Sequence, residues 1–340
     1  MVLNEYLNKY PKLVENYLRE FFEEKKKRLE DPYIVEVFDA IYEYTMRGGK
    51  RLRPLLMIVG YKLYGGEDEE EIIKASASIE IVQSFLLIHD DIMDNSDLRR
   101  GKPTIHKIFE NKYNNKKLGE NLAIIAGDLA SMYSYEIFEN LNFPEERKIK
   151  AMLKMTKIIE DTGYGQILDV LSFFREDFNE KDLLKIHEYK TAKYTIEGPM
   201  IMGAILAGSD NFDVITNYAI PVGIAFQLQD DILGLFGDEK EIGKPVTSDL
   251  EEGKKTLLII KAMENEKFRD TIMKYLGKKG ITIDELNEVR NAVKESGSLE
   301  YSYVKLEELV KIAQESIKPI DNEVKRFLYE FAEYVVKRKY

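Results

Sequence analysis

The spacing of apolar residues is the feature of this sequence that most limits its fold. Near the N-terminus, Val14, Leu18, Phe21 and Phe22 recur at the three- and four-residue intervals of one helix face, within an otherwise charged segment. Similar patterns predict helices over 68–95, 119–140, 146–172, 181–207, 212–236, 255–276, 283–295 and 301–339. No segment alternates convincingly between apolar and polar residues, so we predict an all-α fold.

Prolines and short Gly- or Asn-containing breaks separate these predicted helices. Pro199 and Pro221 fall inside two of them, where each would either kink the helix or mark a boundary between two helices. No linker-like or low-complexity stretch divides the 340 residues. We therefore expect one domain over residues 1–340.

Composition excludes several classes of function. The chain has no cysteine, which rules out disulfides, zinc–thiolate sites and cysteine nucleophiles, and its three histidines argue against a histidine-based metal site. A formal charge of -11 argues against non-specific nucleic-acid binding. The charged N-terminal segment does not resemble a signal peptide, and no stretch is expected to reach membrane-span length. We expect a cytoplasmic protein without a stable membrane anchor.

The first candidate site is the acidic cluster Asp90-Asp91-Ile92-Met93-Asp94, which ends an apolar run. On a helix, Asp90 and Asp94 would lie on one face, where like charges are destabilising and call for a cation or full solvation. Carboxylate oxygens at this spacing suit Mg²⁺, which binds one or two carboxylates together with substrate phosphates. Taken alone, the five residues fit a solvated acidic turn slightly better.

The residues that follow favour the metal interpretation. Arg99, Arg100 and Lys102 come soon after the acidic cluster. Acids that hold metal ions, followed by guanidinium groups that bind phosphate oxygens, are what a metal–diphosphate complex requires.

A second acidic pair, Asp230-Asp231, also ends an apolar run and is followed by basic residues. It lies far enough along the chain from the first pair to come from a facing helix of one bundle. Two such clusters could bind one polyphosphate through several metal ions.

A third basic motif and two weaker signals follow, and for the basic motif we favour phosphate binding. The turn Gly48-Gly49-Lys50-Arg51-Leu52-Arg53-Pro54 carries three positive charges and reads as a phosphate site, as a helix C-cap with basic residues near the dipole, or as both. Gln166 with Asp169, and Lys190 with Thr191, are each ordinary surface when taken alone.

Together these motifs resemble the polyprenyl synthase family, the farnesyl and geranylgeranyl diphosphate synthases. GGKRLRP, DDIMD followed by RRG, GQILD, KT, FQLQDD followed by GDEKEIGKP, and SDLEEGKKT occur in the family's order and spacing between about residues 48 and 256. The resemblance implies a single large helical bundle of the isoprenoid synthase type, with a central cavity between facing Asp-rich helices. It also implies a homodimer with three Mg²⁺ per active site.

The resemblance further assigns a role to each motif residue. It implies metal ligands at Asp90, Asp94, Asp169 and Asp230, and catalytic roles for Asp90, Asp91, Asp94, Asp230, Asp231, Arg99 and Lys190. Substrate binding would fall to Lys50, Arg53, Gln83, Arg99, Arg100, Lys190, Thr191, Gln227, Lys244 and Lys254. Of these, Lys50, Arg53 and Arg100 resemble the isopentenyl diphosphate site.

The implied activity is addition of isopentenyl diphosphate to dimethylallyl, geranyl or farnesyl diphosphate. Phe85, five residues before Asp90, stands where a bulky side chain closes the product pocket in the family, and Leu86 follows it. This combination resembles archaeal-type C20 synthases, so we predict geranylgeranyl diphosphate as the main product. The alternative is farnesyl diphosphate or a C15/C20 mixture. Five residues rotate Phe85 by roughly 140° from Asp90, so an ordinary core role stays open.

One departure from the family and three rival interpretations complete the prediction. Gly234 stands where the second acidic motif often ends in aspartate, so that wall would rely on Asp230, with Asp231. A class I terpene cyclase would lack GGKRLRP and the paired arginines, and an inactive regulatory subunit should have eroded motifs. A structural scaffold would leave the order of six motifs unexplained.

Overall fold

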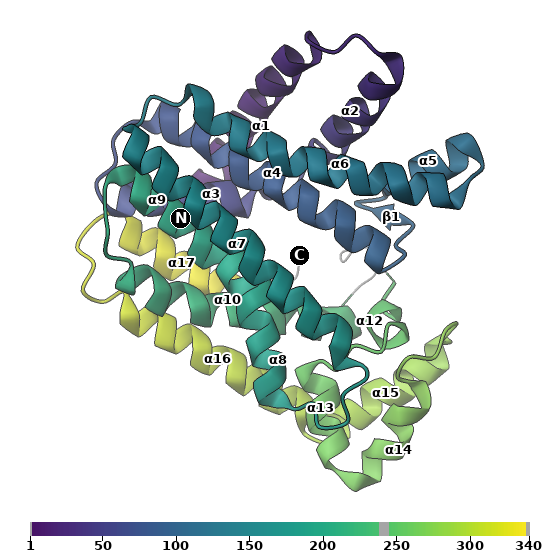
Figure 1. The fold of residues 1–340 in the computed structure, drawn as a ribbon. Helices are drawn as coiled ribbons and strands as arrows, with labels where there is room; N and C mark the ends of the chain where they lie inside the picture. Colours follow the sequence, from purple (N-terminus) through teal and green to yellow (C-terminus); the bar gives the residue numbers. More distant parts are fainter. Residues whose placement is uncertain (1, 238–244, 338–340) are drawn as a thin grey trace. The chain divides into compact units, whose positions relative to one another are not determined.

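Helices make up most of the structure, a computed structural model that describes residues 2–237 and 245–337 (Figure 1). The β structure in these residues is one hairpin of two-residue strands, so the all-α prediction is confirmed. The chain forms two compact units. The first comprises Met1–Thr156 and Pro199–Asp210, and the second comprises Lys157–Gly198 and Asn211–Tyr340.

In the first unit, helix α4 (Glu69–Met93) is the central element and packs against α6, α3 and α1 (Figure 1). The other elements of this unit are α1 (Val2–Lys26), α2 (Pro32–Thr45), α3 (Leu52–Leu63), β1 (Leu98–Arg99), β2 (Lys102–Pro103), α5 (Ile105–Tyr113), α6 (Lys116–Glu136), the 3₁₀-helix η1 (Ile137–Asn140), the start of α7 (Glu145–Ser172) and most of α9 (Gly198–Ala207). The apolar stripe predicted near the N-terminus faces the core, where Val14, Leu18 and Phe22 are buried.

The sequence of α4 explains where this helix begins. The side chain of Asp68 accepts a hydrogen bond from the Glu71 backbone N–H, which is an N-cap, and three glutamates in the first turn complement the positive end of the helix dipole. The helix interior has neither glycine nor proline, and most of its middle is buried. The helix therefore carries its C-terminal residues, which include the first aspartate pair, on a rigid support.

In the second unit, α10 (Asp213–Phe236) is central and packs against α16, α17 and η2 (Figure 1). The other elements are α8 (Glu180–Ile186), the π-helix η2 (His187–Glu197), α12 (Ser248–Glu251), α13 (Leu257–Glu264), α14 (Glu266–Tyr275), α15 (Ile283–Glu295), α16 (Ser298–Ser316) and α17 (Val324–Lys337). Fully buried Tyr218 of α10 donates a hydrogen bond to the Leu328 carbonyl at 2.6 Å, which ties α10 to α17.

Several predicted helix boundaries were wrong. The segment 255–276 divides into α13 and α14 at Asn265, whose side chain caps α14 by accepting from the Lys267 backbone N–H. The segment 301–339 likewise divides into α16 and α17. Pro221 lies inside one continuous helix, α10, whereas Pro199 is the second residue of α9, directly after the π-helix. Proline is well tolerated at such a first turn.

The expectation that no segment reaches membrane-span length was also wrong. Both α4 and α10 are long and apolar enough to span a membrane by length and composition alone. However, 67% of the apolar window of α4 and 56% of that of α10 are buried inside the structure. Core helices of this length give the same signal, because their apolar surface is covered by protein.

Glycines allow α3 and α9 to approach each other closely. A Cβ atom built on Gly203 would lie 2.0 Å from the Met57 carbonyl oxygen, and one built on Gly60 would lie 2.0 Å from the Met200 carbonyl oxygen. Because both obstacles are backbone atoms, neither can rotate away. The helices would have to separate to accept any side chain.

Substitution of Gly203 by alanine should therefore reduce stability. We expect a loss of about 2–3 kcal/mol in the free energy of unfolding, measured by chemical denaturation. Gly163→Ala in α7 is the matched control, because nothing lies within 4 Å of the added Cβ. That change should raise stability by about 0.5–1 kcal/mol through helix propensity. Equal effects in the two variants would contradict the close-packing argument.

Candidate active site

The first aspartate cluster lies at the end of α4 where negative charge is least favourable. Asp90 is in the last turn, with 22% of its side chain exposed, and Asp94 is the exposed C-cap residue. The unsatisfied carbonyls of a helix C-terminus carry partial negative charge, so carboxylates there are destabilised unless a cation is near. Arg99 Nη2, 3.8 Å from Asp90 Oδ2, supplies one such cation from the protein itself.

Asp91 differs from its neighbour because it is 1% exposed and held by two protein partners. Its Oδ2 accepts a hydrogen bond from the Tyr44 hydroxyl at 2.6 Å, and its Oδ1 accepts from Nε and Nη2 of Arg99 at 2.8 and 2.5 Å. Burial opposes the charge on Arg99, but the Asp91 carboxylate outweighs it and raises the pKa of Arg99. Burial also raises the pKa of Tyr44, with Asp91 adding to the effect, so the hydroxyl stays a donor.

A cleft rich in arginine adjoins this network. Its lining residues come from α2, the turn that follows α2, α4 and the β1–β2 hairpin. They are Tyr44, Arg47, Glu80, Gln83, Ser84, Leu87, Arg99 and Arg100. The structure thus brings three of the predicted substrate-binding residues together. Arg47, which sequence reasoning missed, pairs with Glu43 at 2.7 Å and donates to the Arg99 carbonyl at 3.4 Å. Its position directly before Gly48 and Gly49 was the sequence feature that could have identified it.

In the GGKRLRP turn, one basic residue is buried in ion pairs and two are more accessible. Gly48 and Gly49 have positive φ, and Arg51 follows with φ 48°. Arg51 is buried and forms ion pairs with Glu15 at 3.0 Å and Glu80 at 2.5 Å. Arg51 thus holds the turn to α1 and α4. The remaining basic residues of the motif are better placed for a ligand, since Lys50 is exposed and Arg53 is half-buried in the first turn of α3.

Arg100 connects this turn to the hairpin that follows α4. Its guanidinium donates a hydrogen bond to the Gly48 carbonyl, and a Cβ atom on Gly49 would lie 3.1 Å from Arg100 Nη2. The predicted isopentenyl diphosphate residues Lys50, Arg53 and Arg100 therefore belong to one local assembly of the first unit.

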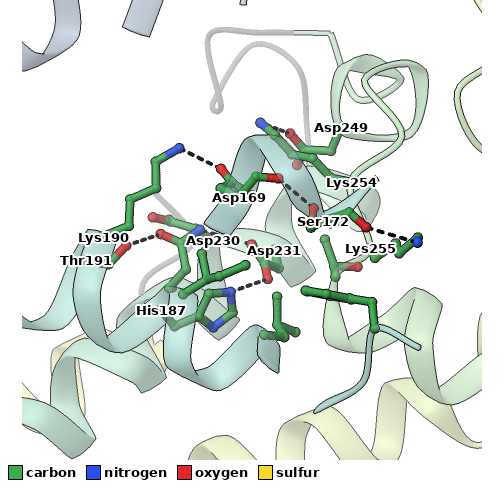
Figure 2. Close-up of a pocket in the computed structure, with 15 residues that line it drawn as sticks. Asp169, Ser172, His187, Lys190, Thr191, Asp230, Asp231, Asp249, Lys254 and Lys255 are labelled. Atoms are coloured by element: carbon green, nitrogen blue, oxygen red, sulfur yellow. Dashed lines mark hydrogen bonds and ion pairs between the residues drawn. The ribbon is translucent and has the colours of Figure 1, made fainter. Parts of the chain in front are cut away.

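The second aspartate pair lines a pocket in the second unit (Figure 2). The pocket has a volume of about 120 Å³. Its lining comprises Asp169, Ser172, Phe178, Leu183, Ile186, His187, Lys190, Thr191, Gln227, Asp230, Asp231, Asp249, Lys254, Lys255 and Thr256. Seven of the predicted site residues are among them. Lys190 Nζ lies 2.7 Å from Asp169 Oδ2, and Figure 2 shows this pair at the edge of the pocket.

Asp231 is mostly buried, at 9% exposed, and its two oxygens contact protein groups. Oδ1 accepts a hydrogen bond from Gln227 Nε2 at 3.0 Å, and Oδ2 lies 3.4 Å from His187 Nε2. Asp230, by contrast, is half-buried and lines the pocket. The second aspartate of each pair, Asp91 or Asp231, is thus the more deeply buried member.

Gly234 leaves space for an acid from another part of the chain. A Cβ atom on Gly234 would lie 2.3 Å from Asp249 Oδ2, so any side chain there would displace this carboxylate. Gly234 lies one turn after Asp230, and Asp249 therefore supplies a carboxylate next to the position where the family motif often has its own. The sequence alone assigned Asp249 no role. Its position shortly before the basic residues Lys254 and Lys255 was the sequence feature that could have indicated one.

Two lysines near Asp249 have different environments. Lys254 lies 2.7 Å from Glu252 and 3.4 Å from Asp249. Lys255 Nζ donates to the carbonyls of Ser172 and Arg175 at 3.1 and 2.8 Å, which satisfies backbone groups at the end of α7 and in the segment that follows it. The predicted residue Lys244 lies outside the described residues.

Phe85, the predicted chain-length residue, is half-buried on α4. Its ring packs edge-to-face on His89, with centroids 5.1 Å apart. His89 in turn lies 3.1 Å from the Ile124 carbonyl of α6, and a Cβ atom on Gly127 would lie 2.3 Å from His89 Nε2. Phe85 is thus supported from the side by a packed α4–α6 contact.

The donor atoms available at both clusters fit a hard divalent cation. They are carboxylate oxygens, which Mg²⁺ prefers. Within residues 2–237 and 245–337, no three His, Cys, Asp or Glu side chains converge as a preformed metal cage.

Comparison with known proteins places the chain in a family. The all-helical fold is that of solved isoprenyl diphosphate synthases. Residues 35–293 match the polyprenyl synthetase family, and the chain belongs to it. The predicted family membership is therefore confirmed.

Relatives match almost the whole chain. A geranylgeranyl diphosphate synthase of Sulfolobus acidocaldarius is 36% identical over 315 residues, 90% of this chain and 92% of that protein. A geranylfarnesyl diphosphate synthase of Aeropyrum pernix is 32% identical over 335 residues, 96% of this chain and 99% of that protein. A solved geranylgeranyl pyrophosphate synthase from Corynebacterium glutamicum, complexed with isoprenyl diphosphate and magnesium, has a TM-score of 0.91 at 27% identity. Its alignment covers 98% of this chain and 99% of that chain.

The two members of the first aspartate pair should differ in their effect on stability. Asp91→Asn leaves the Arg99 guanidinium without its carboxylate, and we expect a loss of about 2 kcal/mol in the free energy of unfolding. The loss is smaller than for a fully buried pair because 30% of the Arg99 side chain is exposed. Asp90→Asn is the matched control and should leave stability unchanged or slightly raised. Chemical denaturation measures both, and a larger loss for Asp90→Asn would contradict the burial argument.

Proposed function

We propose that this protein is a short-chain trans-prenyl diphosphate synthase that makes mainly geranylgeranyl diphosphate. Membership of the polyprenyl synthetase family supports the reaction class, and relatives named geranylgeranyl diphosphate synthase support the product. The observation that carries the proposal is a common arrangement in each unit. In the first unit, half-buried Asp90 lies 3.8 Å from Arg99, which lines the arginine-rich cleft. In the second unit, half-buried Asp230 lines the same pocket as Lys190 and Lys254.

The reaction needs a leaving diphosphate whose charge is neutralised. In the proposed mechanism, the allylic diphosphate is bound by Lys190, Thr191, Lys254 and Arg99. Their charge-assisted hydrogen bonds strengthen as the allylic C–O bond breaks, because negative charge then gathers on the departing oxygens. Magnesium ions on Asp90 and Asp94, on Asp230, and with help from Asp169 would add Lewis-acid stabilisation of the same charge.

The second substrate is the nucleophile. Lys50, Arg53 and Arg100 are proposed to hold the diphosphate of isopentenyl diphosphate, with Gln83 nearby in the cleft. Its double bond attacks the allylic carbocation, which forms the new C–C bond. Loss of a proton to the released pyrophosphate then restores neutrality at carbon. This route needs no histidine, cysteine or serine nucleophile.

Three finer points belong to the same proposal. We propose three Mg²⁺ per active site, a cytoplasmic location and a homodimer. The dimer is supported by large apolar side chains left exposed on α6 and on the start of α7. These are Ile124, Ile125, Met132, Ile149 and Leu153, which are 42–64% exposed. A second copy of the chain would cover such a surface.

Incubation with isopentenyl diphosphate and each allylic primer, with and without Mg²⁺, tests the proposed activity. Asp90→Ala and Asp230→Ala should each lower turnover at least a thousandfold, about 4 kcal/mol in the barrier, while circular dichroism stays native. Glu252→Gln, which changes an acid that pairs with Lys254 outside the aspartate pairs, is the control and should keep most activity. Near-normal turnover of either aspartate variant would refute the metal assignment.

Product length depends on Phe85 in this proposal. Its half-buried ring would limit how far the growing chain extends, as a bulky residue does at this position in the family. The Aeropyrum pernix relative, named for a product one isoprene unit longer, shows that related chains differ in product length.

Phe85→Ala should therefore lengthen the product beyond C20, because the chain can enter the space that the ring vacates. Chromatography of the dephosphorylated products measures this. Leu86→Ala is the neighbouring control and should shift the distribution less. If Phe85→Ala only lowers stability and leaves the products at C20, Phe85 is an ordinary core residue.

A further inference from the structure

Helices η2 and α10 lie in close contact through their small residues. A Cβ atom on Gly223 of α10 would lie 2.4 Å from the Cα and Cβ atoms of Ala192. This approach brings two side chains of η2, His187 and Thr191, against two of α10, Asp231 and Gln227. The earlier residue of η2 meets the later residue of α10, as expected for helices that run in opposite directions.

The four side chains form one continuous chain of polar contacts. His187 Nε2 lies 3.4 Å from Asp231 Oδ2, and Asp231 Oδ1 accepts a hydrogen bond from Gln227 Nε2 at 3.0 Å. Gln227 Oε1 then accepts from the Thr191 hydroxyl at 2.9 Å. All four residues line the pocket of the second unit, and Figure 2 shows the His187–Asp231 and Thr191 contacts.

The chain of contacts determines the orientation of each amide and hydroxyl. Asp231 accepts at Oδ1, so Gln227 must present its NH₂ group to Asp231 and its carbonyl oxygen to Thr191. The Thr191 hydroxyl hydrogen therefore points to Gln227. This hydrogen bond also sets the direction of the lone pairs on the Thr191 hydroxyl oxygen. On its other side, Asp231 Oδ2 makes no hydrogen bond within the described residues, and the imidazole of His187 approaches it to 3.4 Å.

The His187 side chain is buried and has one polar contact among the described residues. Its residue is 4% exposed, and its Nδ1 atom has no hydrogen-bond partner within the described residues. Its polar contact in the structure is therefore the one with Asp231. Burial of a histidine whose Nδ1 atom has no hydrogen-bond partner lowers the free energy of unfolding. Its single polar contact is to Asp231, next to Asp230, which indicates that this contact has a role in the site.

We propose that His187 is a positioning residue for the allylic diphosphate site. It acts through Asp231 and Gln227, holding Thr191 and the adjacent Lys190 in the orientation that binds the diphosphate. This role rests on the proposed function, because the ligand is the diphosphate of the allylic substrate. It also gives Asp231 an internal role that differs from metal binding by Asp230.

The test compares two variants of His187. His187→Phe keeps a ring of similar size but removes the polar contact, whereas His187→Gln keeps a side-chain N–H donor. We expect His187→Phe to raise the KM for farnesyl diphosphate about tenfold or more, with the KM for isopentenyl diphosphate changed less than twofold. In His187→Gln, the KM for farnesyl diphosphate should rise by no more than half as much as in His187→Phe. Glu188→Gln, which changes the next residue of η2 outside the pocket lining, should leave both KM values unchanged.

A binding measurement separates this proposal from the proposed function. Thermal protection by inorganic pyrophosphate with MgCl₂ needs no turnover, and His187→Phe should raise the pyrophosphate concentration for half-maximal protection about tenfold. The double variant with Asp231→Asn should add little to either single change if both act through one chain of contacts. Unchanged KM and protection in a folded His187→Phe variant, or equal losses in His187→Phe and His187→Gln, would overturn the role. Absence of prenyl transfer by the wild-type protein, with pyrophosphate protection intact, would instead refute the proposed function.

Discussion

Buried carboxylates on the two central helices organise the polar residues around each aspartate pair. Asp91 would be costly inside the first unit if Tyr44 and Arg99 did not surround it with donors. Asp231 accepts a hydrogen bond from Gln227, and its Oδ2 atom lies 3.4 Å from His187 Nε2. The Tyr44 and Arg99 contacts tie α4 to α2 and the β1–β2 hairpin. The His187 contact joins α10 to η2, whereas Gln227 lies on α10 itself, one turn before Asp231. The same carboxylates that would destabilise an isolated helix end thus organise the groups proposed to bind diphosphate.

The two members of each aspartate pair have different environments and, we propose, different roles. The more exposed members, Asp90 and Asp230, adjoin a cleft or pocket, where carboxylate oxygens suit Mg²⁺. Neighbouring residues on a helix point about 100° apart, so one member can face the interior while the other faces a ligand. Of two consecutive aspartates at one helix end, the buried member can therefore bind neighbouring protein side chains while the other member binds a metal ion.

Much of the fold and of the site could be predicted from the sequence, and the failures have identifiable causes. The helical period predicted α4 and α10 to within two residues, because both helices are long and strongly patterned. Asn265 ended a predicted helix early through a cap that competes with the apolar pattern. Arg51 and Asp249 could not be assigned because their environments depend on contacts with residues far along the chain, Glu80 and Gly234. Motif order identified which residues gather, but the burial of Asp91 and Asp231 depends on tertiary packing.

A crystal structure of the protein with Mn²⁺ and pyrophosphate tests the division between the aspartates most directly. Anomalous scattering would locate the metal ions independently of any assumption about their ligands. The account predicts ions at about 2.1–2.2 Å from carboxylate oxygens of Asp90 and Asp230, with Asp91 still bound to Tyr44 and Arg99 and Asp231 still bound to Gln227. Direct coordination of an ion by Asp91 or Asp231, with release of these protein partners, would contradict it.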